Sequence, residues 1–256
     1  MSALIVSLVN QKGGVGKTTT AVSLAVGLGR RGQRVLLIDL DPQANATSAL
    51  GVAGGDSPGI YDAILDETPM TECIVRVEAE GIDLVPSSAE LSGAEVELVP
   101  VLARERRLTN AIAAVKDRYD WVLIDCPPSL GLLTINALSA SESVVIPVQC
   151  EYMALEGLSR LMETLELVKR NLNPALHVLG VVLTMFDART RLAQQVVDEV
   201  RNHFPQTFTT IIPRSVRLSE APSHGQSIFV YDPGGRAATA YDAVASELLE
   251  RVGAAV

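Results

Sequence analysis

Short runs of aliphatic residues alternate with longer amphipathic segments along the whole chain. The aliphatic runs predict seven β-strands: Leu4–Val9, Arg34–Asp39, Ile82–Val85, Trp121–Asp125, Ser143–Val148, His177–Thr184 and Thr209–Ile212. Segments between them repeat apolar residues at three- and four-residue spacing and predict helices at Thr18–Arg31, Leu155–Arg170, Arg189–Asn202 and Ala237–Val252. Strands that alternate with such helices form right-handed crossovers around a parallel sheet. We therefore expect a three-layer α/β/α fold with a mostly parallel, twisted sheet.

Signals for a domain boundary are weak. The glycine-rich segment Gly51–Pro58 is expected to be a loop, and Asp232–Gly235 a turn before the last helix. Neither resembles an interdomain linker, and the chain contains no internal repeat or low-complexity tract. The pattern predicts a single domain over residues 1–256.

Composition supports this architecture and limits the function. Hydrophobic residues make up 48% of the chain but aromatic residues only 4%, so the core is aliphatic, as in a parallel sheet that is buried on both faces. The 21 basic and 30 acidic residues give a net charge of −9. Such a chain is not a general polycation that coats nucleic acid, although a local basic patch is compatible with it.

Cysteine usage and hydropathy indicate a soluble cytoplasmic protein. Cys73, Cys126 and Cys150 are odd in number and widely spaced, which fits neither a disulfide framework nor a zinc site. The apolar run Ala3–Val9 lacks the basic region and cleavage site of a signal peptide. No segment reaches the roughly 18–20 consecutive apolar residues that a membrane span requires.

The most informative segment joins the first predicted strand to the first predicted helix. Its sequence is Gln11-Lys12-Gly13-Gly14-Val15-Gly16-Lys17-Thr18. Glycines let successive backbone N–H groups turn inward around an anion, and the following helix adds the partial positive charge of its N-terminus. In such a loop Lys17 contacts the β- and γ-phosphates, and the Thr18 hydroxyl ligates Mg²⁺. The expected nucleotide-binding residues here are Lys12, Gly13, Gly14, Val15, Gly16, Lys17, Thr18 and Thr19.

Two predicted strands end in aspartate, where parallel strands bring their carboxyl ends to the edge that holds the phosphate loop. Asp39 and Asp41 follow the second strand, and Asp125 ends the fourth. Mg²⁺ keeps several waters and takes one or two carboxylates together with phosphate oxygens. Each aspartate could instead cap a neighbouring helix, and for Asp39 a purely structural role is as good an interpretation as a functional one.

The phosphate loop departs from the general pattern GxxxxGK[ST]. Gln11 occupies the first glycine position, and a second lysine, Lys12, follows it. In this respect the loop resembles the deviant Walker A motif KGGxGKT of the ParA/MinD/nitrogenase-iron-protein group of P-loop ATPases. The resemblance implies that Lys12 reaches across a nucleotide-sandwich dimer to the partner's phosphates, as an arginine finger does elsewhere. The alternative for Lys12 is a solvated surface charge.

Five segments along the chain resemble the chromosomal ParA/Soj partition ATPases, namely 10–20, 39–47, 125–129, 183–190 and 212–222. The resemblance implies that Asp125 is the Walker B aspartate, which holds Mg²⁺ together with Thr18. It also implies that Asp41 orients or activates the attacking water, so the catalytic residues would be Lys12, Lys17 and Asp41. Pro213 and Arg214 fall in the stretch that packs near the adenine. Two residues depart from the family pattern: Ala44 stands where glycine is usual, and Ser215 where asparagine is common.

The family resemblance implies a switch rather than a metabolic catalyst. ATP, with Mg²⁺, would close a homodimer that binds double-stranded DNA without sequence preference, and hydrolysis would release the DNA. A side chain at Gly13 would block the close approach of the two subunits. Intrinsic hydrolysis would be weak and stimulated by a ParB-type centromere-binding partner. The expected location is cytoplasmic and nucleoid-associated.

A DNA-binding surface on an acidic chain requires a local concentration of positive charge. Residues 186–236 contain six basic and five acidic residues, whereas the rest of the chain is strongly acidic. Arg189 and Arg217 lie in stretches that match DNA-contacting segments of the family, and arginine suits phosphate contacts. The alternative for each is a solvated or salt-bridged surface arginine.

Three rival functions remain to be weighed. Membrane positioning, as in MinD, needs a basic amphipathic C-terminal helix, but the tail 246–256 carries two glutamates and one arginine and is expected to pack as a closing helix. An iron–sulfur role needs paired cysteines at a dimer axis, whereas Cys126 and Cys150 are typical buried fillers. An ATP-dependent ligase or kinase of the dethiobiotin-synthetase type would need an acceptor pocket beside the γ-phosphate, which spacing alone does not exclude.

Overall fold

The computed structural model describes residues 3–55 and 57–253. Within these residues, seven strands form one sheet in the order β3-β4-β2-β5-β1-β6-β7. The strands are β1 Leu4–Leu8, β2 Val35–Asp39, β3 Val75–Val77, β4 Ile82–Val85, β5 Trp121–Asp125, β6 Ser143–Gln149 and β7 His177–Thr184. All neighbouring pairs are parallel except β3 and β4, which are antiparallel. The predicted α/β class is confirmed.

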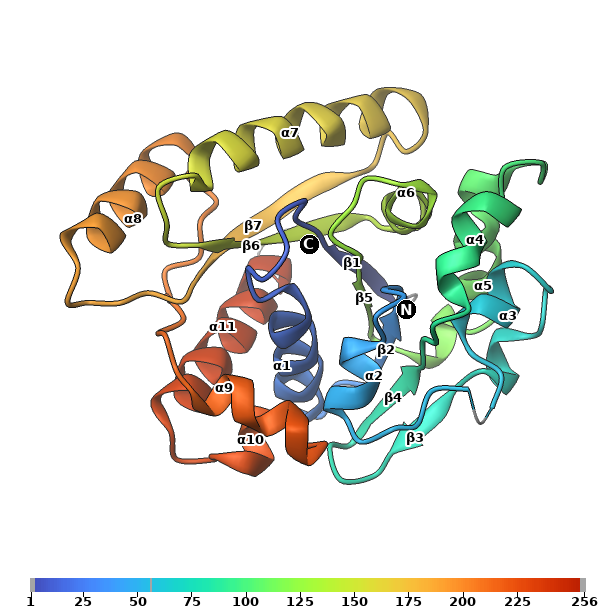
Figure 1. Ribbon diagram of the computed structural model, residues 1–256, viewed down its shortest axis with the longest axis horizontal. Helices are drawn as coiled ribbons and strands as arrows, with labels where there is room; N and C mark the ends of the chain where they lie inside the picture. The colour runs from blue at the N-terminus through green and yellow to red at the C-terminus, as the bar shows by residue number, and fades with distance from the viewer. Residues whose placement is uncertain (1–2, 56, 254–256) are drawn as a thin grey trace.

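Helices cover both faces of the sheet. In Figure 1, α6, α7 and α8 lie on one face, and α1 and α11 pack side by side on the other. The helices are α1 Lys17–Gly29, α2 Asn45–Ala49, α3 Ile60–Ile64, α4 Leu91–Glu97, α5 Arg107–Ala113, α6 Leu132–Ala140, α7 Ala154–Asn171, α8 Arg191–His203, α9 Arg217–Glu220, α10 Ile228–Tyr231 and α11 Arg236–Gly253. Short 3₁₀ turns lie at Met70–Glu72, Arg104–Arg106, Lys116–Arg118 and Ala221–His224.

The central strands explain why the sheet needs two helical layers. Every residue of β2 and β5 is buried, so their side chains point alternately into two separate cores. In β1, for example, Ile5 packs in one core and Val6 in the other. Each such aliphatic side chain contributes about 1.5–3 kcal/mol when it is buried. The core therefore packs well with few aromatic residues, because branched aliphatic side chains fit the pleated surface between helices.

One predicted strand is wrong. Residues Thr209–Ile212 form irregular chain beside β7, with only isolated bridges at Val181–Thr207 and Phe186–Pro213. The backbone N–H groups of Thr209 and Thr210 donate to the Glu247 carboxylate of α11 instead of to a neighbouring strand. Conversely, the three-residue edge strand β3 was not predicted, since it is too short to show a periodic pattern.

Two predicted features include residues that lie outside the described part of the chain. The predicted loop 51–58 is irregular where it is described, but position 56 lies outside the described residues. The predicted closing helix continues as α11 to Gly253, and positions 254–256 also lie outside them. Among the described helices, none has both the length and the apolar character needed to cross a bilayer.

Candidate nucleotide-binding site

The phosphate loop lies between the carboxyl end of β1 and the first turn of α1. Gly14 and Gly16 adopt left-handed backbone angles, with φ of 73° and 86°, which only glycine takes without strain. Gly16 directly precedes α1, and no side chain caps that helix. The first backbone N–H groups of α1 are therefore free of side-chain acceptors and point to the place where an anion would bind.

Two neighbouring strands hold the loop in place. The Asn10 side chain donates to the carbonyl of Pro147 in β6 (2.7 Å) and accepts from the backbone N–H of Lys12 (2.9 Å). At the end of β7, the Thr184 hydroxyl donates to the carbonyl of Val15 (2.8 Å). The loop is thus preorganised by side chains to which sequence reasoning assigned no role. Asn10 could have been found, because a buried amide at a strand end needs partners.

Lys17 lies in the loop's concave side and is almost fully buried. Its ammonium donates to the carbonyl of Lys12 at 3.3 Å. Burial lowers the pKa of Lys17, while the nearby carboxylates of Asp125 and Asp41 oppose that shift. A cavity of about 440 Å³ opens here, lined by loop residues Gly13, Gly14, Gly16, Lys17, Thr18 and Thr19 and by Asp41, among others. The structure therefore brings most of the predicted phosphate-binding residues to one cavity.

Asp125 provides the most unusual polar group of the site. It stands beside Asp39 in the register of β5 and β2, and it is completely buried. Neither of its oxygens accepts a hydrogen bond of good geometry from the described residues, although the Thr18 side chain approaches closely enough to lower its pKa. Burial, followed by the charge of Asp39, raises the pKa of Asp125 well above its ordinary value. A buried carboxylate without a partner, next to a hydroxyl, fits the oxygen ligands of Mg²⁺.

Asp39 and Asp41 have different surroundings. Asp39 accepts from both the backbone N–H (2.8 Å) and the hydroxyl (2.7 Å) of Thr47, and burial raises its pKa to about 6. These bonds tie β2 to α2 and favour the structural interpretation of Asp39. Asp41 accepts from the backbone N–H of Gln43 and lines the cavity. Ala44 then takes a left-handed φ of 51°, the conformation for which glycine is suited.

Lys12 points away from the cavity that its own loop encloses. Its ammonium forms an ion pair with Glu151 at 2.9 Å, and both side chains are about half exposed. Lys12 is not among the described residues that line the cavity, although Gly13 and Lys17 on either side are. Sequence reasoning missed Glu151, which lies three residues after the predicted strand 143–148.

The remaining predicted site residues lie at the rim. Pro213 and Arg214 do not line the cavity. The wall that the C-terminal part of the chain contributes comes instead from residues between Leu218 and Ile228. Pro213 and Arg214 stay close to it, since the Arg214 N–H donates to the carbonyl of Phe186 just beyond β7. The two predicted DNA-binding arginines are both engaged locally: Arg189 with Asp187 at 2.7 Å, and Arg217 with Glu220 at 2.9 Å.

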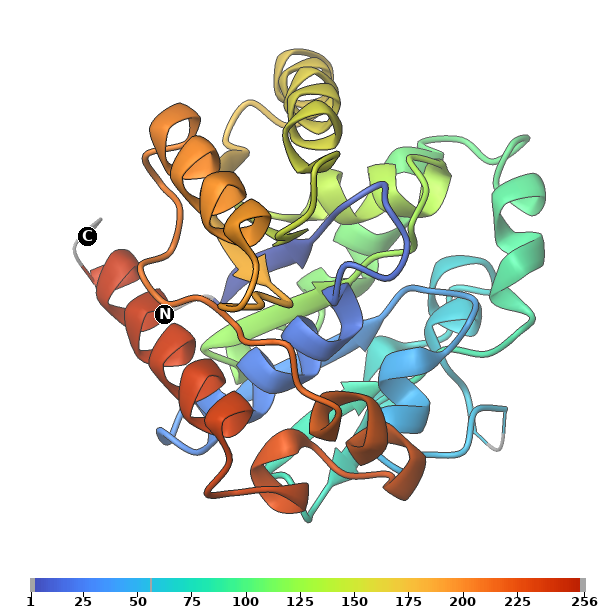
Figure 2. The same ribbon diagram turned by 60° about the vertical axis from the view of Figure 1, so that its left-hand side comes forward.

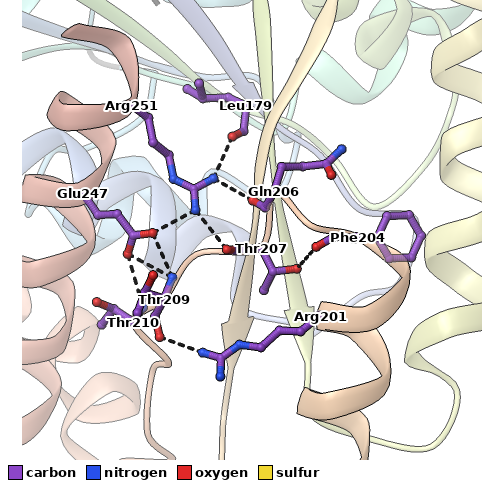
Figure 3. Close-up of polar contacts among 9 residues, drawn as sticks. All are labelled: Leu179, Arg201, Phe204, Gln206, Thr207, Thr209, Thr210, Glu247 and Arg251. Atoms are coloured by element: carbon purple, nitrogen blue, oxygen red, sulfur yellow. Dashed lines mark hydrogen bonds and ion pairs between the residues drawn. The ribbon is translucent and has the colours of Figure 1, made fainter. Parts of the chain in front are cut away.

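Helix α11 fixes the segment that leads to this rim. Figure 3 shows that Arg251 donates to the carbonyls of Leu179, Gln206 and Thr207. Glu247 accepts from Arg251 and from the backbone N–H groups of Thr209 and Thr210. The Arg251 guanidinium also lies 4.0 Å from the centre of the Phe208 ring. Glu247 thus holds the start of the segment that was predicted to be a strand, and Arg251 holds the chain directly before it.

The fold and the phosphate loop define a P-loop nucleoside triphosphatase, and the comparisons with known proteins agree. A family model described as an AAA domain matches residues 3–178. The sporulation initiation inhibitor protein Soj of Bacillus subtilis is 54% identical over 246 residues, which cover 95% of this chain and 97% of that protein. The chromosome partitioning protein ParA of Myxococcus xanthus is 51% identical and covers 96% and 88%. The chain belongs to the ParA/Soj family of partition ATPases.

Solved structures extend this likeness to the site. Cobyrinic acid a,c-diamide synthase of Mycobacterium smegmatis, with bound ADP and magnesium, has a TM-score of 0.87 and 34% identity, with 99% of this chain and 97% of that one covered. A plasmid partition protein of Borrelia burgdorferi bound to AMPPNP has a TM-score of 0.82 and 26% identity, covering 99% and 100%. ATP and Mg²⁺ are accordingly the cofactors of this chain's class of protein.

Proposed function

We propose that this protein is an ATP-driven DNA partition switch. ATP closes a homodimer with two nucleotides at the interface, the dimer binds double-stranded DNA without sequence preference, and hydrolysis, stimulated by a ParB-type partner, releases it. The observation that carries this proposal is the position of Lys12. An extra lysine in a phosphate loop, held outside its own cavity by Glu151, is placed to serve a second copy of the chain rather than its own nucleotide.

Within one subunit, different side chains bind the phosphates, hold Mg²⁺ and orient the attacking water. Lys17 and the backbone N–H groups of the loop hold the β- and γ-phosphates, and Thr18 with Asp125 would hold Mg²⁺, which neutralises charge on the phosphate oxygens. Asp41, which lines the cavity, orients the attacking water. Lys12 from the partner would complete the charge stabilisation, so that full activity requires two chains.

Gly13 supports the dimer on steric grounds. A Cβ built at this position meets no atom within 4 Å, and its φ is not in the left-handed region. The subunit itself therefore leaves space around a β-carbon at this position. A functional defect of Gly13→Val would report on a second copy that approaches the loop.

The sharpest test is size-exclusion elution with ADP, ATP and a non-hydrolysable analogue, followed by retention of each species on DNA. Wild type should dimerise with the analogue alone, and the dimer should be retained. Lys12→Ala and Gly13→Val should stay monomeric, Asp41→Ala should accumulate as a dimer that turns over slowly, and Lys17→Gln should lose nucleotide binding. Lys169→Ala, on the exposed side of α7, is the matched control. A wild-type protein that stays monomeric when saturated with the analogue contradicts the proposal.

We also propose that residues 1–256 act as a single domain, and that the protein acts at the nucleoid rather than at a membrane. The continuous sheet supports the first statement, because its strands come from both halves of the chain. The chromosome partitioning named for the Myxococcus xanthus relative supports the second.

A small-molecule synthase is the second candidate, because a solved neighbour at 34% identity carries that activity in its name. The cavity extends past the phosphate loop along an apolar wall, which includes Val22, Leu218 and Ile228. ATP turnover separates the two candidates. Stimulation by DNA together with a ParB-type partner supports the switch, whereas turnover driven by a small acceptor supports the synthase.

A further inference from the structure

Glu80 is a buried carboxylate in the tight turn between β3 and β4, at the edge of the sheet. Its side chain is only 6% exposed, and Gly81 closes the turn with a left-handed φ of 70°. Among the described residues, no lysine, arginine or histidine forms an ion pair with Glu80. The nearest cation in the sequence, Arg76, pairs with Glu78 and Asp83 instead. A carboxylate that is buried without a counter-ion is costly unless hydrogen bonds compensate for the lost water.

Both carboxylate oxygens of Glu80 accept hydrogen bonds from one residue. The backbone N–H of Ser227 donates at 2.7 Å, and the Ser227 hydroxyl donates at 2.6 Å. Ser227 is itself buried and directly precedes α10. Figures 1 and 2 both show the β3–β4 turn beside α10, although the two segments are far apart in the chain. Glu80 therefore fixes the start of α10 through a contact that spans 147 positions.

The start of α10 belongs to the wall of the nucleotide cavity. Ser227 and Ile228 line the same cavity that opens at the phosphate loop. Because the loop binds the phosphates, the nucleoside of a bound nucleotide has the remaining lining to occupy. That part includes the apolar side chains of Val22, Leu218 and Ile228, and apolar walls of this kind suit the face of a purine base.

The chain before α10 is held in two different ways. At Gly225 it touches the backbone of Gly51, since a Cβ built at Gly225 would lie 2.8 Å from the Cα of Gly51. Such a contact limits how closely the two segments approach but sets no orientation. The two hydrogen bonds to Glu80 are directional, so they determine how Ser227 is turned relative to the cavity.

We propose that Glu80 is a positioning residue for the nucleoside end of the nucleotide site. Through Ser227 it holds the wall at the start of α10 in place, whereas Asn10 and Thr184 hold the phosphate loop. Different parts of the fold thus position the two ends of the nucleotide. The proposal requires only that the cavity binds a nucleotide. It does not rest on dimerisation, DNA binding or hydrolysis.

Isothermal titration of the nucleotide-free full chain with ADP and with pyrophosphate, both with Mg²⁺, tests this division. ADP contacts the loop and the wall, whereas pyrophosphate contacts the loop alone. Glu80→Met keeps most of the volume but removes both acceptors, so the Kd for ADP should rise about tenfold and that for pyrophosphate should stay within about twofold. In Glu80→Gln the amide accepts from the N–H and donates to the hydroxyl, which should bring the Kd for ADP to within about threefold of wild type.

A milder variant removes a single hydrogen bond of the pair. Ser227→Ala loses the hydroxyl but keeps the N–H donor, and its Kd for ADP should rise about threefold. Combined with Glu80→Met it should weaken ADP binding no further, because the bond is already absent. Tyr119→Phe is the matched control, since it removes a 2.8 Å hydrogen bond to Asp83 in the same hairpin but away from the cavity. This variant should bind both ligands like wild type.

Three results would overturn the proposal. Equal losses of ADP and pyrophosphate affinity in Glu80→Met and Ser227→Ala would mean that the defect reaches the phosphate loop. Wild-type ADP affinity in both variants would mean that the wall needs no positioning. Equal losses in Glu80→Gln and Glu80→Met would mean that charge, and not the hydrogen-bonded position, matters. Failure of the proposed function is distinct from all three, because it concerns dimerisation with the analogue and retention on DNA.

Discussion

The two lysines of the phosphate loop show how surroundings assign different tasks to one residue type. Lys17 is buried against the loop, and burial lowers its pKa, whereas Lys12 is half exposed in an ion pair outside the cavity. A buried cation that faces carboxylates is already desolvated and fixed, which suits phosphate binding. A mobile surface cation can instead move to a second molecule. The motif predicted both lysines, but only the structure separates their positions.

Ala44 is strained in a way that allows a stabilising substitution. Its left-handed φ of 51° costs an alanine about 1–2 kcal/mol. A glycine would avoid this cost, but part of the gain in stability would be lost because glycine gives the unfolded chain more conformational entropy. We expect Ala44→Gly to raise the free energy of unfolding by about 0.5–1 kcal/mol, measured by urea denaturation. Ala243→Gly, at an exposed position inside helix α11, should lower it by a similar amount. Equal and negative effects of both substitutions would show that Ala44 is not strained.

At the residue level, the sequence predicted what local chemistry determines. Gly16, Lys17 and Thr18 were assigned from one contiguous motif, and the structure gathers them at one cavity. The Lys12–Glu151 ion pair was not predictable, because it depends on β6 lying next to β1 and joins residues 139 positions apart. The left-handed conformation of Ala44 had a trace in the sequence, since glycine is usual at that position in the family.

Paired strand ends create a strongly perturbed carboxylate pair. Because β2 and β5 run parallel in register, Asp39 and Asp125 lie side by side in the buried edge of the sheet. Burial raises the pKa of Asp125 well above its ordinary value and that of Asp39 to about 6. A carboxylate with a raised folded-state pKa favours the folded state while it is protonated. That advantage is lost as the pH rises above the ordinary aspartate pKa of about 4.

We therefore expect Asp125→Asn to stabilise the nucleotide-free protein at pH 7. The gain over wild type should shrink toward zero as the pH falls to about 4, because wild-type Asp125 is then neutral as well. Urea denaturation across this pH range measures it. Mg²⁺ with an ATP analogue should stabilise wild type but not the variant.

Asp120→Asn provides the opposite case. Its hydrogen bonds with Arg34 lower the pKa of Asp120, so its stabilising contribution is present at pH 7 and lost as the pH falls. The Asn variant should therefore be less stable than wild type at pH 7 and approach it at acidic pH. The same pH trend in both variants would contradict the assignment for Asp125.

The hydrogen bonds of Glu247 and Arg251, which we call the α11 clamp, show why one element could not be predicted. Thr209–Ile212 consists of four β-branched residues, which favour a strand. The N–H groups of Thr209 and Thr210 are nevertheless satisfied by Glu247, far away in the sequence, and Ile212 donates to Leu183 of β7. A propensity argument sees the β-branched residues but not the side chain that competes with the sheet. The long, strongly periodic helices α7 and α11 were placed within about one or two residues, as expected where the pattern itself creates the buried face.

Removing the clamp should destabilise the chain substantially. Arg251→Met keeps most of the side-chain volume but leaves the carbonyls of Leu179, Gln206 and Thr207 without their donor. We expect a loss of about 2–3 kcal/mol in the free energy of unfolding by urea denaturation. Arg170→Met, at an exposed position near the end of α7, should stay within about 0.5 kcal/mol of wild type. Similar small effects of both would show that solvent replaces the clamp.

On the scale of the whole molecule, a chain of net charge −9 must concentrate its positive charge to bind DNA. Arg189 and Arg217 are each neutralised by a neighbouring carboxylate in this conformation. Arg191, Arg214 and Arg236 are exposed and lack a carboxylate within 4 Å among the described residues. A dimer doubles the number of arginine contacts with DNA phosphates, so two subunits together can bind DNA that one subunit binds too weakly.

The ion pair of Arg189 makes the DNA surface testable in both directions. Hydrogen bonds from Arg189 hold the pKa of Asp187 well below its usual range, so Asp187 stays charged and competes with DNA phosphates for the guanidinium. We expect Asp187→Asn to strengthen retention of the ATP-bound dimer on DNA about threefold or more at low salt, and Arg189→Glu to weaken it, with dimerisation unchanged in both. Asp117→Asn makes the same change in net charge and should have little effect, because Asp117 precedes the start of the central strand β5, whereas Asp187 follows the end of the edge strand β7. If Asp187→Asn and Asp117→Asn strengthen retention equally, overall charge rather than this surface governs binding.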